Sequence, residues 1–184
     1  MEENSTPSPT LMQHAIRWGL ITAAVSIILT MTLYVVDYTL MVQLKFLFLG
    51  LAIYFGITIY AGIDYRKSIG GFIPYGKAFQ HGLIVLALSG LIASIFNLLL
   101  YHVIDPELPQ KLVDASLENT RAMMEGFGAP EESMDEAMEQ ARESTAKQFT
   151  VGGMALGYIW IVVFSAIMSL ISSIFVRKNQ PEAM

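Results

Sequence analysis

The chain alternates between long apolar runs and short polar connections. Four of the apolar runs are long enough to cross a bilayer, which takes about 20 residues of helix at a rise of about 1.5 Å per residue. They cover residues 15–36, 44–63, 79–101 and 153–176. The pattern therefore predicts an all-α integral membrane protein, in which residues 15–178 form a single domain with four transmembrane helices.

The polar segments around these runs differ in charge. Residues 1–14 and 179–184 are polar and predict tails without regular structure. The connection over residues 62–82 is short, basic and rich in glycine, whereas residues 105–149 hold eleven acidic and four basic side chains. Because short segments rich in Lys and Arg stay in the cytoplasm, we expect both tails there and the acidic insertion on the opposite side of the membrane.

The acidic insertion has the pattern of two amphipathic helices. Residues 105–107, Asp-Pro-Glu, are typical of a helix start. The Gly and Pro residues at 126–130 predict a break, after which a second helix follows. The apolar positions expected on one face of the first helix are Val113, Leu117, Met124 and Phe127. We therefore expect an extracytoplasmic helical hairpin between the third and fourth spans.

Small and polar residues within the spans predict where helices pack closely. Gly153 and Gly157 form a GxxxG pair at the start of the last span. Gly82, Gly90 and Asn97 fall roughly on one face of the third span. An unpaired amide is costly in hydrocarbon, so Asn97 is expected to face the bundle. The GxxxG pair is expected to pack within the bundle or between protomers, and Gly157→Ile should then disturb assembly.

The basic connection contains a near-match to a phosphate-binding loop. Residues 71–78, GFIPYGKA, approach the pattern GxxxxGK[ST], but Ala78 replaces the hydroxyl that holds Mg²⁺. A membrane helix precedes this loop in place of the required β-strand, which argues against nucleotide binding. The candidate residues for a cytoplasmic contact surface here are Arg66, Lys67, Tyr75 and Lys77.

Candidate catalytic and metal-binding residues are few. The chain has no Cys, which excludes a thiolate nucleophile and a Cys-based zinc site. His14, His81 and His102 lack the spacing of metal-binding pairs and are expected at membrane interfaces. No ionisable residue falls deep in a predicted span, and no catalytic constellation is present. We predict no metal site, no cofactor and no enzymatic activity.

Several short stretches resemble a known family. They are Tyr65-Arg66, Gly70-Gly71-Phe72, residues 75–79, Gly82, residues 105–107 and residues 149–153. In this order they resemble domain-of-unknown-function family 4199, a group of small bacterial membrane proteins. The resemblance covers roughly residues 16–178. It implies a four-span protein of the inner membrane and carries over no activity.

Two hypotheses about function follow. The first is a non-enzymatic scaffold or accessory subunit that binds a protein partner, or a second copy of itself, through the acidic insertion or the small-residue faces. The alternative is a small transporter or permease component, motivated by polar faces at Ser26/Thr30, Asn97 and Ser165/Ser169. A wet cavity along those faces would favour transport, and dry packing would argue against it. The bilayer is an expected partner, and nucleic acid is not.

Overall fold

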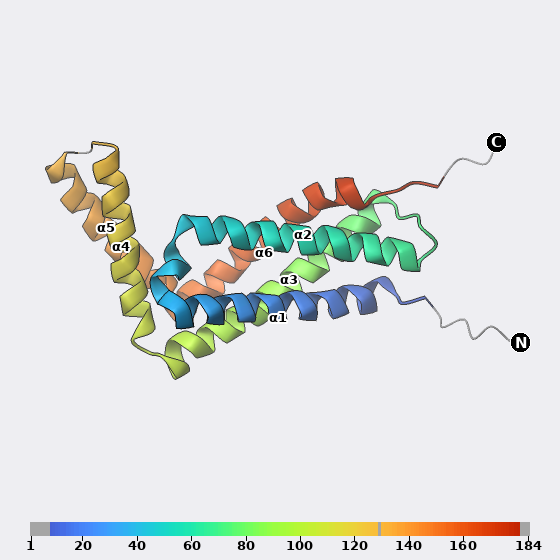
Figure 1. Ribbon diagram of the computed structural model, residues 1–184, viewed down its shortest axis with the longest axis horizontal. Helices are drawn as coiled ribbons and strands as arrows, with labels where there is room; N and C mark the ends of the chain where they lie inside the picture. The colour runs from blue at the N-terminus through green and yellow to red at the C-terminus, as the bar shows by residue number, and fades with distance from the viewer. Residues whose placement is uncertain (1–7, 129, 181–184) are drawn as a thin grey trace, which may run out of the picture. The chain divides into compact units, whose positions relative to one another are not determined.

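The computed structural model describes residues 8–128 and 130–180, and this part of the chain is all-α (Figure 1). The helices are α1 (Leu11–Asp37), the 3₁₀-helix η1 (Tyr38–Val42), α2 (Leu44–Ser68), α3 (Tyr75–Leu99), the π-helix η2 (Leu100–Ile104), α4 (Leu108–Gly126), α5 (Glu131–Gln148) and α6 (Val151–Val176). Four candidate membrane spans are formed by α1 with η1, by α2, by α3 with η2, and by α6. The shorter α4 and α5 lie between the third and fourth spans, so the predicted fold class is confirmed.

The helices extend beyond the predicted apolar runs. Helix α1 begins at Leu11, so residues 11–14, which the polarity pattern assigns to a tail, are helical and include His14. Helix α2 continues past residue 63 to Ser68. An apolar run shows which residues can lie in lipid. A helix continues until its backbone hydrogen bonds are interrupted, so it can extend into polar residues beyond the run. The predicted tail residues 1–7 and 181–184 lie outside the described residues.

A glycine turn ends α2. Gly70 and Gly71 have φ angles of 94° and 89°, in the left-handed region that favours glycine. The Gly71 N–H donates to the Arg66 carbonyl at 2.8 Å, which is the outer hydrogen bond of a Schellman motif. Ile73 then exchanges two backbone hydrogen bonds with Lys178, at 2.9 and 3.0 Å. The α2–α3 loop is thereby tied to the segment that follows α6.

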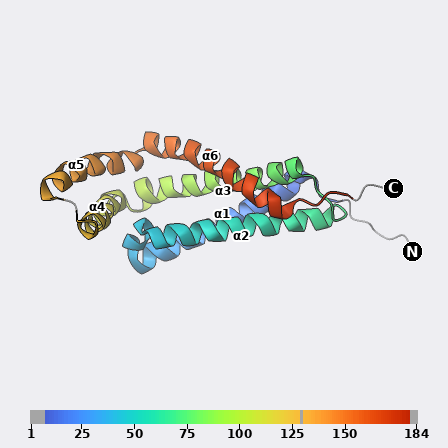
Figure 2. The same cartoon turned by 90° about the horizontal axis from the view of Figure 1, so that it is seen from above.

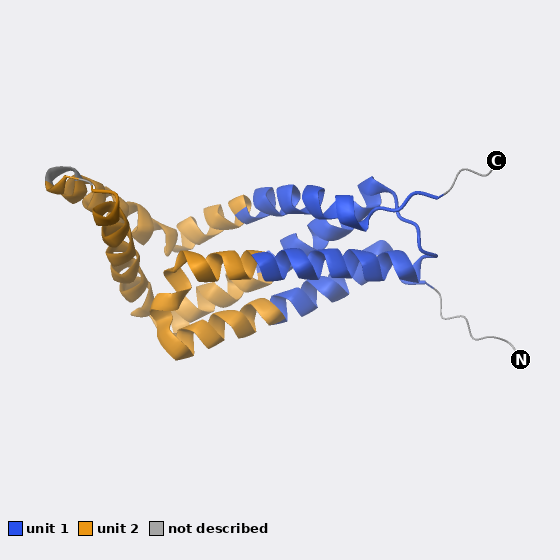
Figure 3. Ribbon diagram, turned by 45° about the horizontal axis from the view of Figure 1, so that its top comes forward, with its two compact units in different colours: residues 1–24, 52–91, 161–184 blue, residues 25–51, 92–160 orange. Residues whose placement is uncertain are grey.

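The chain divides into two compact units, which Figure 3 colours separately. Unit 1 comprises residues 1–24, 52–91 and 161–184, and unit 2 comprises residues 25–51 and 92–160. Unit 1 therefore contains the start of α1, the end of α2, the start of α3 and the end of α6. These are the helix ends that a chain crossing the membrane four times brings to one side. A buried cluster of Tyr65, Ile73, Ala78 and Val176 forms the apolar core of this unit.

Two of the predicted packing glycines lie at contacts between α3 and α6 within unit 1. A Cβ added at Gly82 would lie 2.6 Å from Ser169 Oγ, and one added at Gly90 would lie 2.6 Å from Ile161 Cγ2. Glycine carries a hydrogen atom where other residues carry a Cβ, and this lets α3 and α6 approach closely at both positions.

The serine face of α6 is packed dry in unit 1. Ser169 is fully buried, and its hydroxyl donates to the Phe79 carbonyl at 2.7 Å. Ser165 is also buried, and the Ser172 hydroxyl donates to the Ser169 carbonyl. Hydroxyls bonded to backbone carbonyls join helices in an apolar medium. This packing argues against a wet cavity lined by Ser165 and Ser169.

Unit 2 is organised around the turn between α3 and α4. Leu100, Leu108 and Leu112 form its buried apolar cluster. Asp105 lies at the centre of the turn: its Oδ1 accepts the Leu108 N–H at 3.1 Å, and its Oδ2 accepts the Tyr34 hydroxyl at 3.2 Å. Asp105 therefore caps the start of α4 as the sequence indicates, although the helix itself begins three residues later.

Helices α4 and α5 pack against each other as a hairpin (Figure 2). Val113, on the predicted apolar face, is buried. Phe127, also on the predicted apolar face, directly follows the last residue of α4 and is 84% exposed. Lys147 and Glu143 form an exposed ion pair on α5, and the hydrogen bond from Lys147 lowers the pKa of the Glu143 carboxyl.

The GxxxG pair has two different environments in unit 2. A Cβ at Gly153 would overlap the Lys147 backbone carbonyl at the junction between α5 and α6, whereas a Cβ at Gly157 would have open space within 4 Å. Thr150 caps this junction by accepting the Gly153 N–H at 3.0 Å. Gly153 is thus needed by the turn itself. A role for Gly157 between protomers stays a prediction.

We expect Gly153→Ala to destabilise the protein by about 1–3 kcal/mol, because backbone must move to admit the methyl group. Gly157→Ala is the matched control, and it should leave the thermal midpoint unchanged or raise it slightly, since alanine favours the helix. Thermal unfolding in detergent measures both variants. Equal midpoints would contradict the steric account of the junction.

Candidate functional site

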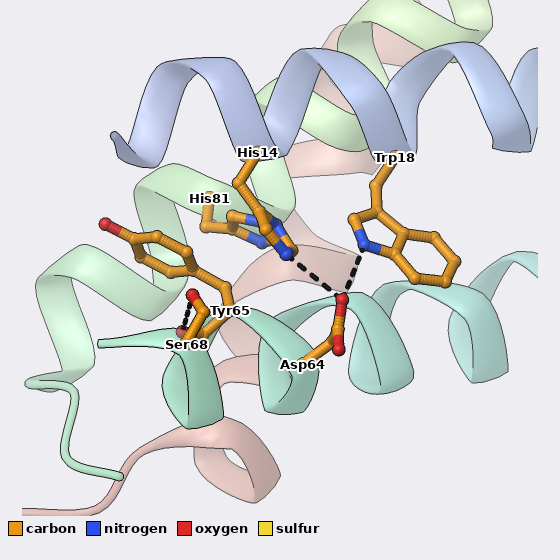
Figure 4. A network of polar contacts seen from close by, with 6 residues as sticks. All are labelled: His14, Trp18, Asp64, Tyr65, Ser68 and His81. Atoms are coloured by element: carbon orange, nitrogen blue, oxygen red, sulfur yellow. Dashed lines mark hydrogen bonds and ion pairs between the residues drawn. The ribbon is translucent and has the colours of Figure 1, made fainter. Parts of the chain in front are cut away.

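Three helices bring a polar cluster together within unit 1 (Figure 4). His14 and Trp18 lie one turn apart on α1 and share a face. Asp64 and Tyr65 come from the last part of α2, and His81 comes from α3. We call these five residues the histidine cluster.

His14 is the centre of a hydrogen-bonded chain. Its Nε2 lies 3.1 Å from Asp64 Oδ2, and its Nδ1 lies 2.9 Å from His81 Nε2. The Trp18 indole N–H donates to the same Asp64 oxygen at 3.2 Å. The Tyr65 ring stacks on His81, with the ring centroids 5.1 Å apart and the planes 5° from parallel. Both imidazoles are thus held by hydrogen bonds and by ring packing.

Small residues make room for these rings. Ala61 lies one turn before Tyr65, and Ala78 lies three residues before His81, so each shares a helix face with a ring. Both alanines are buried, as is Ala15 beside His14. Larger side chains would take up volume that the rings fill, since protein interiors are close-packed.

The hydrogen-bond partners fix where the protons lie. An indole N–H can only donate, and a carboxylate can only accept, so Asp64 is the acceptor for Trp18 and for His14 Nε2–H. Neutral His14 then has an acceptor at Nδ1, which takes the Nε2–H of His81. This arrangement leaves His81 Nδ1 as an acceptor without a donor.

Burial increases along the chain from Asp64 to His81. The Asp64 side chain is 47% exposed, His14 is 5% exposed and His81 is fully buried. His81 Nδ1 has no hydrogen-bond partner, and among the described residues only Asn97 Oδ1 shares this condition. Leaving a buried acceptor unpaired costs about 1–3 kcal/mol. The chain of hydrogen bonds thus ends at a buried nitrogen whose lone pair is unused.

The cluster can take up one proton without breaking. A proton added at His81 Nδ1 leaves its Nε2–H directed at His14 Nδ1. A second proton would put N–H groups on both sides of the 2.9 Å contact, where neither nitrogen could accept. The two imidazoles therefore hold a single excess proton between them, and His14 connects the buried His81 with the half-exposed Asp64 carboxylate.

The structure gives the predicted contact residues individual roles. The Arg66 guanidinium donates to the Val176 carbonyl at 2.8 Å, and the Tyr75 hydroxyl donates to the Leu170 carbonyl at 2.9 Å. Lys67 and Lys77 make no ion pair with the residues that the structure describes. A contact surface for a protein partner at these positions stays a prediction.

Sequence reasoning missed the histidine cluster. It predicted that His14 and His81 lie at membrane interfaces, and it did not predict that both are buried and joined to each other. The available signal was that His14, Asp64 and His81 all lie near span ends on the same predicted side of the membrane. His102 belongs to unit 2 and is exposed. Within the described part of the chain, no three His, Cys, Asp or Glu side chains are grouped as metal ligands.

Residues 17–178 match the family DUF4199, described as proteins of unknown function. Asp64 and His81 lie inside the matched region, and His14 lies just before it. No curated protein and no solved structure matches the chain.

Proposed function

Because the chain belongs to the DUF4199 family of proteins of unknown function, we propose a function from its own residues: it is a small proton-coupled transporter or permease component, without enzymatic activity. The proposed path does not follow the serine face of α6, whose dry packing argues against a solute path there. Asp64, His14 and His81 pass the proton. The observation that carries this proposal is the hydrogen-bonded chain that ends at the buried, unpartnered His81 Nδ1. Ionisable side chains joined inside a transmembrane bundle are typical of proton relays.

A proton that enters at His81 Nδ1 has a continuous route. His81 passes its Nε2 proton to His14 Nδ1, and His14 passes its Nε2 proton to Asp64. Asp64 then releases the proton to water, since its side chain is half exposed. Each ring ends with its proton on the other nitrogen, so the cycle closes only when both rings regain their starting tautomers. That resetting step gives the bundle a means to link proton transfer to a movement of its helices.

We place the histidine cluster on the cytoplasmic side of a bacterial inner membrane. This part of the proposal is supported by the distribution of Lys and Arg, which favours the cytoplasm for the ends gathered in unit 1. The relay would then exchange protons with the cytoplasm through Asp64.

Proton flux into liposomes tests the relay. The purified protein is reconstituted with a pH-sensitive dye inside, and a potassium diffusion potential is imposed with valinomycin. We expect the wild type to carry protons faster than protein-free liposomes. His81→Gln should reduce the rate to that of protein-free liposomes, because an amide cannot take up and pass on a proton at neutral pH.

His102→Gln is the matched control, since it replaces a histidine outside the cluster in the same way. It should keep the wild-type rate. The proposal is wrong if the wild type carries no more protons than empty liposomes, or if His81→Gln retains the wild-type rate.

A scaffold or accessory subunit is the second candidate function. The observation in its favour is Phe127, which is 84% exposed where α4 ends, next to the acidic surface of the hairpin. A large exposed aromatic side chain among charged residues is a common feature of protein contact sites. A protein partner or a second copy of the chain would bury it.

A further inference from the structure

Unit 1 carries an excess of positive charge that the protein does not neutralise. Its described residues include one acidic side chain, Asp64, and six basic ones: Arg17, Arg66, Lys67, Lys77, Arg177 and Lys178. Asp64 is already bonded to His14 and Trp18. None of the six basic side chains forms an ion pair with another described residue. A surface of this kind attracts an anion.

Backbone contacts gather three of these cations where α2 and α6 end. Arg66 donates from Nη1 to the carbonyl of Val176, the residue directly before Arg177. Lys178 is fixed by its backbone pairing with Ile73. The Lys178 ammonium also lies 5.4 Å from the centre of the Phe72 ring. The fold therefore brings the Arg66 guanidinium to the segment of chain that carries Arg177 and Lys178.

Exposed apolar side chains lie next to this group. Ile174 and Phe175 are 56% and 58% exposed at the end of α6. On a membrane span such side chains face lipid chains. Basic side chains directly beyond the apolar end of a span are the arrangement that attracts anionic lipid headgroups.

We propose that Arg66, Arg177 and Lys178 form a binding site for the headgroup of an anionic phospholipid. Guanidinium groups bind phosphate oxygens with paired hydrogen bonds, and an ammonium group adds a point charge. The acyl chains lie along the exposed apolar side chains of α6. This site is independent of the histidine cluster and does not rest on the proposed function.

Lipid retention measured by native mass spectrometry tests the site. The purified protein is mixed with phosphatidylglycerol or with phosphatidylcholine in a neutral detergent, and the bound lipid is counted. We expect the wild type to retain phosphatidylglycerol preferentially. The double variant Arg177→Gln/Lys178→Gln should bind it about tenfold more weakly or worse, since each basic residue near the surface contributes to attraction of an anionic lipid.

The matched control is Arg121→Gln/Lys147→Gln, which removes the same charge from the hairpin. It should keep the wild-type preference. Folding of the test variant is checked by its thermal midpoint, and the pairing of Lys178 with Ile73 uses backbone atoms that the substitution retains. Equal retention of both lipids by the wild type, or equal weakening in the control, would overturn the proposal. Displacement of the lipid by soluble glycerol phosphate would also overturn it, because the acyl chains would then contribute nothing.

Discussion

Replacing Gly82 by alanine is expected to lower the thermal midpoint by several degrees. The added methyl group would lie 2.6 Å from Ser169 Oγ and 3.2 Å from Thr58 Cγ2. Ser169 must then move, and its hydroxyl loses the 2.7 Å hydrogen bond to the Phe79 carbonyl. Overpacking of this kind costs about 1–3 kcal/mol, and an unpaired buried hydroxyl adds to that cost. Together these exceed the roughly 1 kcal/mol that alanine gains over glycine in a helix.

Gly76→Ala on the same helix separates the two effects. A Cβ at Gly76 meets nothing within 4 Å, so this variant should keep or raise the midpoint. Thermal unfolding of both variants in one detergent gives the comparison. If Gly82→Ala is as stable as Gly76→Ala, the close approach of α3 and α6 is not what makes glycine necessary at position 82.

Replacing Asp64 should separate its role in the relay from its role in stability. Asp64→Leu removes the acceptor for both His14 Nε2–H and the Trp18 indole N–H. His14 is buried and Trp18 is partly buried. A buried donor left without an acceptor costs about 1–3 kcal/mol, so this variant should unfold at a clearly lower temperature. Asp64→Asn keeps an amide oxygen that can accept a hydrogen bond, and it should unfold close to the wild type.

In proton flux, Asp64→Asn should resemble Asp64→Leu and not the wild type. Neither asparagine nor leucine can take up and release the proton that leaves His14, so both variants should carry protons no faster than protein-free liposomes. A stable Asp64→Asn variant with wild-type flux would show that protons do not pass through Asp64. A loss of flux with a wild-type midpoint would assign it a role in transfer rather than in folding.

The membrane architecture could be predicted from the sequence because it depends on local pattern. Four apolar runs of sufficient length predict four spans, and an acidic segment with Gly and Pro residues in its middle predicts a helical hairpin. The structure confirms both. The span ends were less predictable: Asp64 and Arg66 are too polar for an apolar run, yet they continue α2.

The histidine cluster could not be predicted because its contacts join distant parts of the chain. His14 and His81 are separated by 67 residues, and no local pattern specifies that their nitrogens lie 2.9 Å apart. For the GxxxG pair the motif could be recognised in the sequence, but its structural role could not. Its spacing is typical of packing between helices. Glycine is necessary at position 153, however, because of the backbone carbonyl of Lys147, in the last turn of α5. A short motif specifies residue types, but the neighbouring atoms in the fold determine what each residue does.

The pairing of Ile73 with Lys178 has a consequence for the order of assembly. Val176, which contacts Gly62 and belongs to the buried core of unit 1, lies in the last of the four spans to be synthesised. The residues of the histidine cluster are made much earlier, within the first three spans. Their surroundings are therefore completed only after the final span has entered the membrane and Lys178 has reached Ile73. A nascent chain that stops before α6 would contain every residue of the cluster and still lack the packing that encloses it.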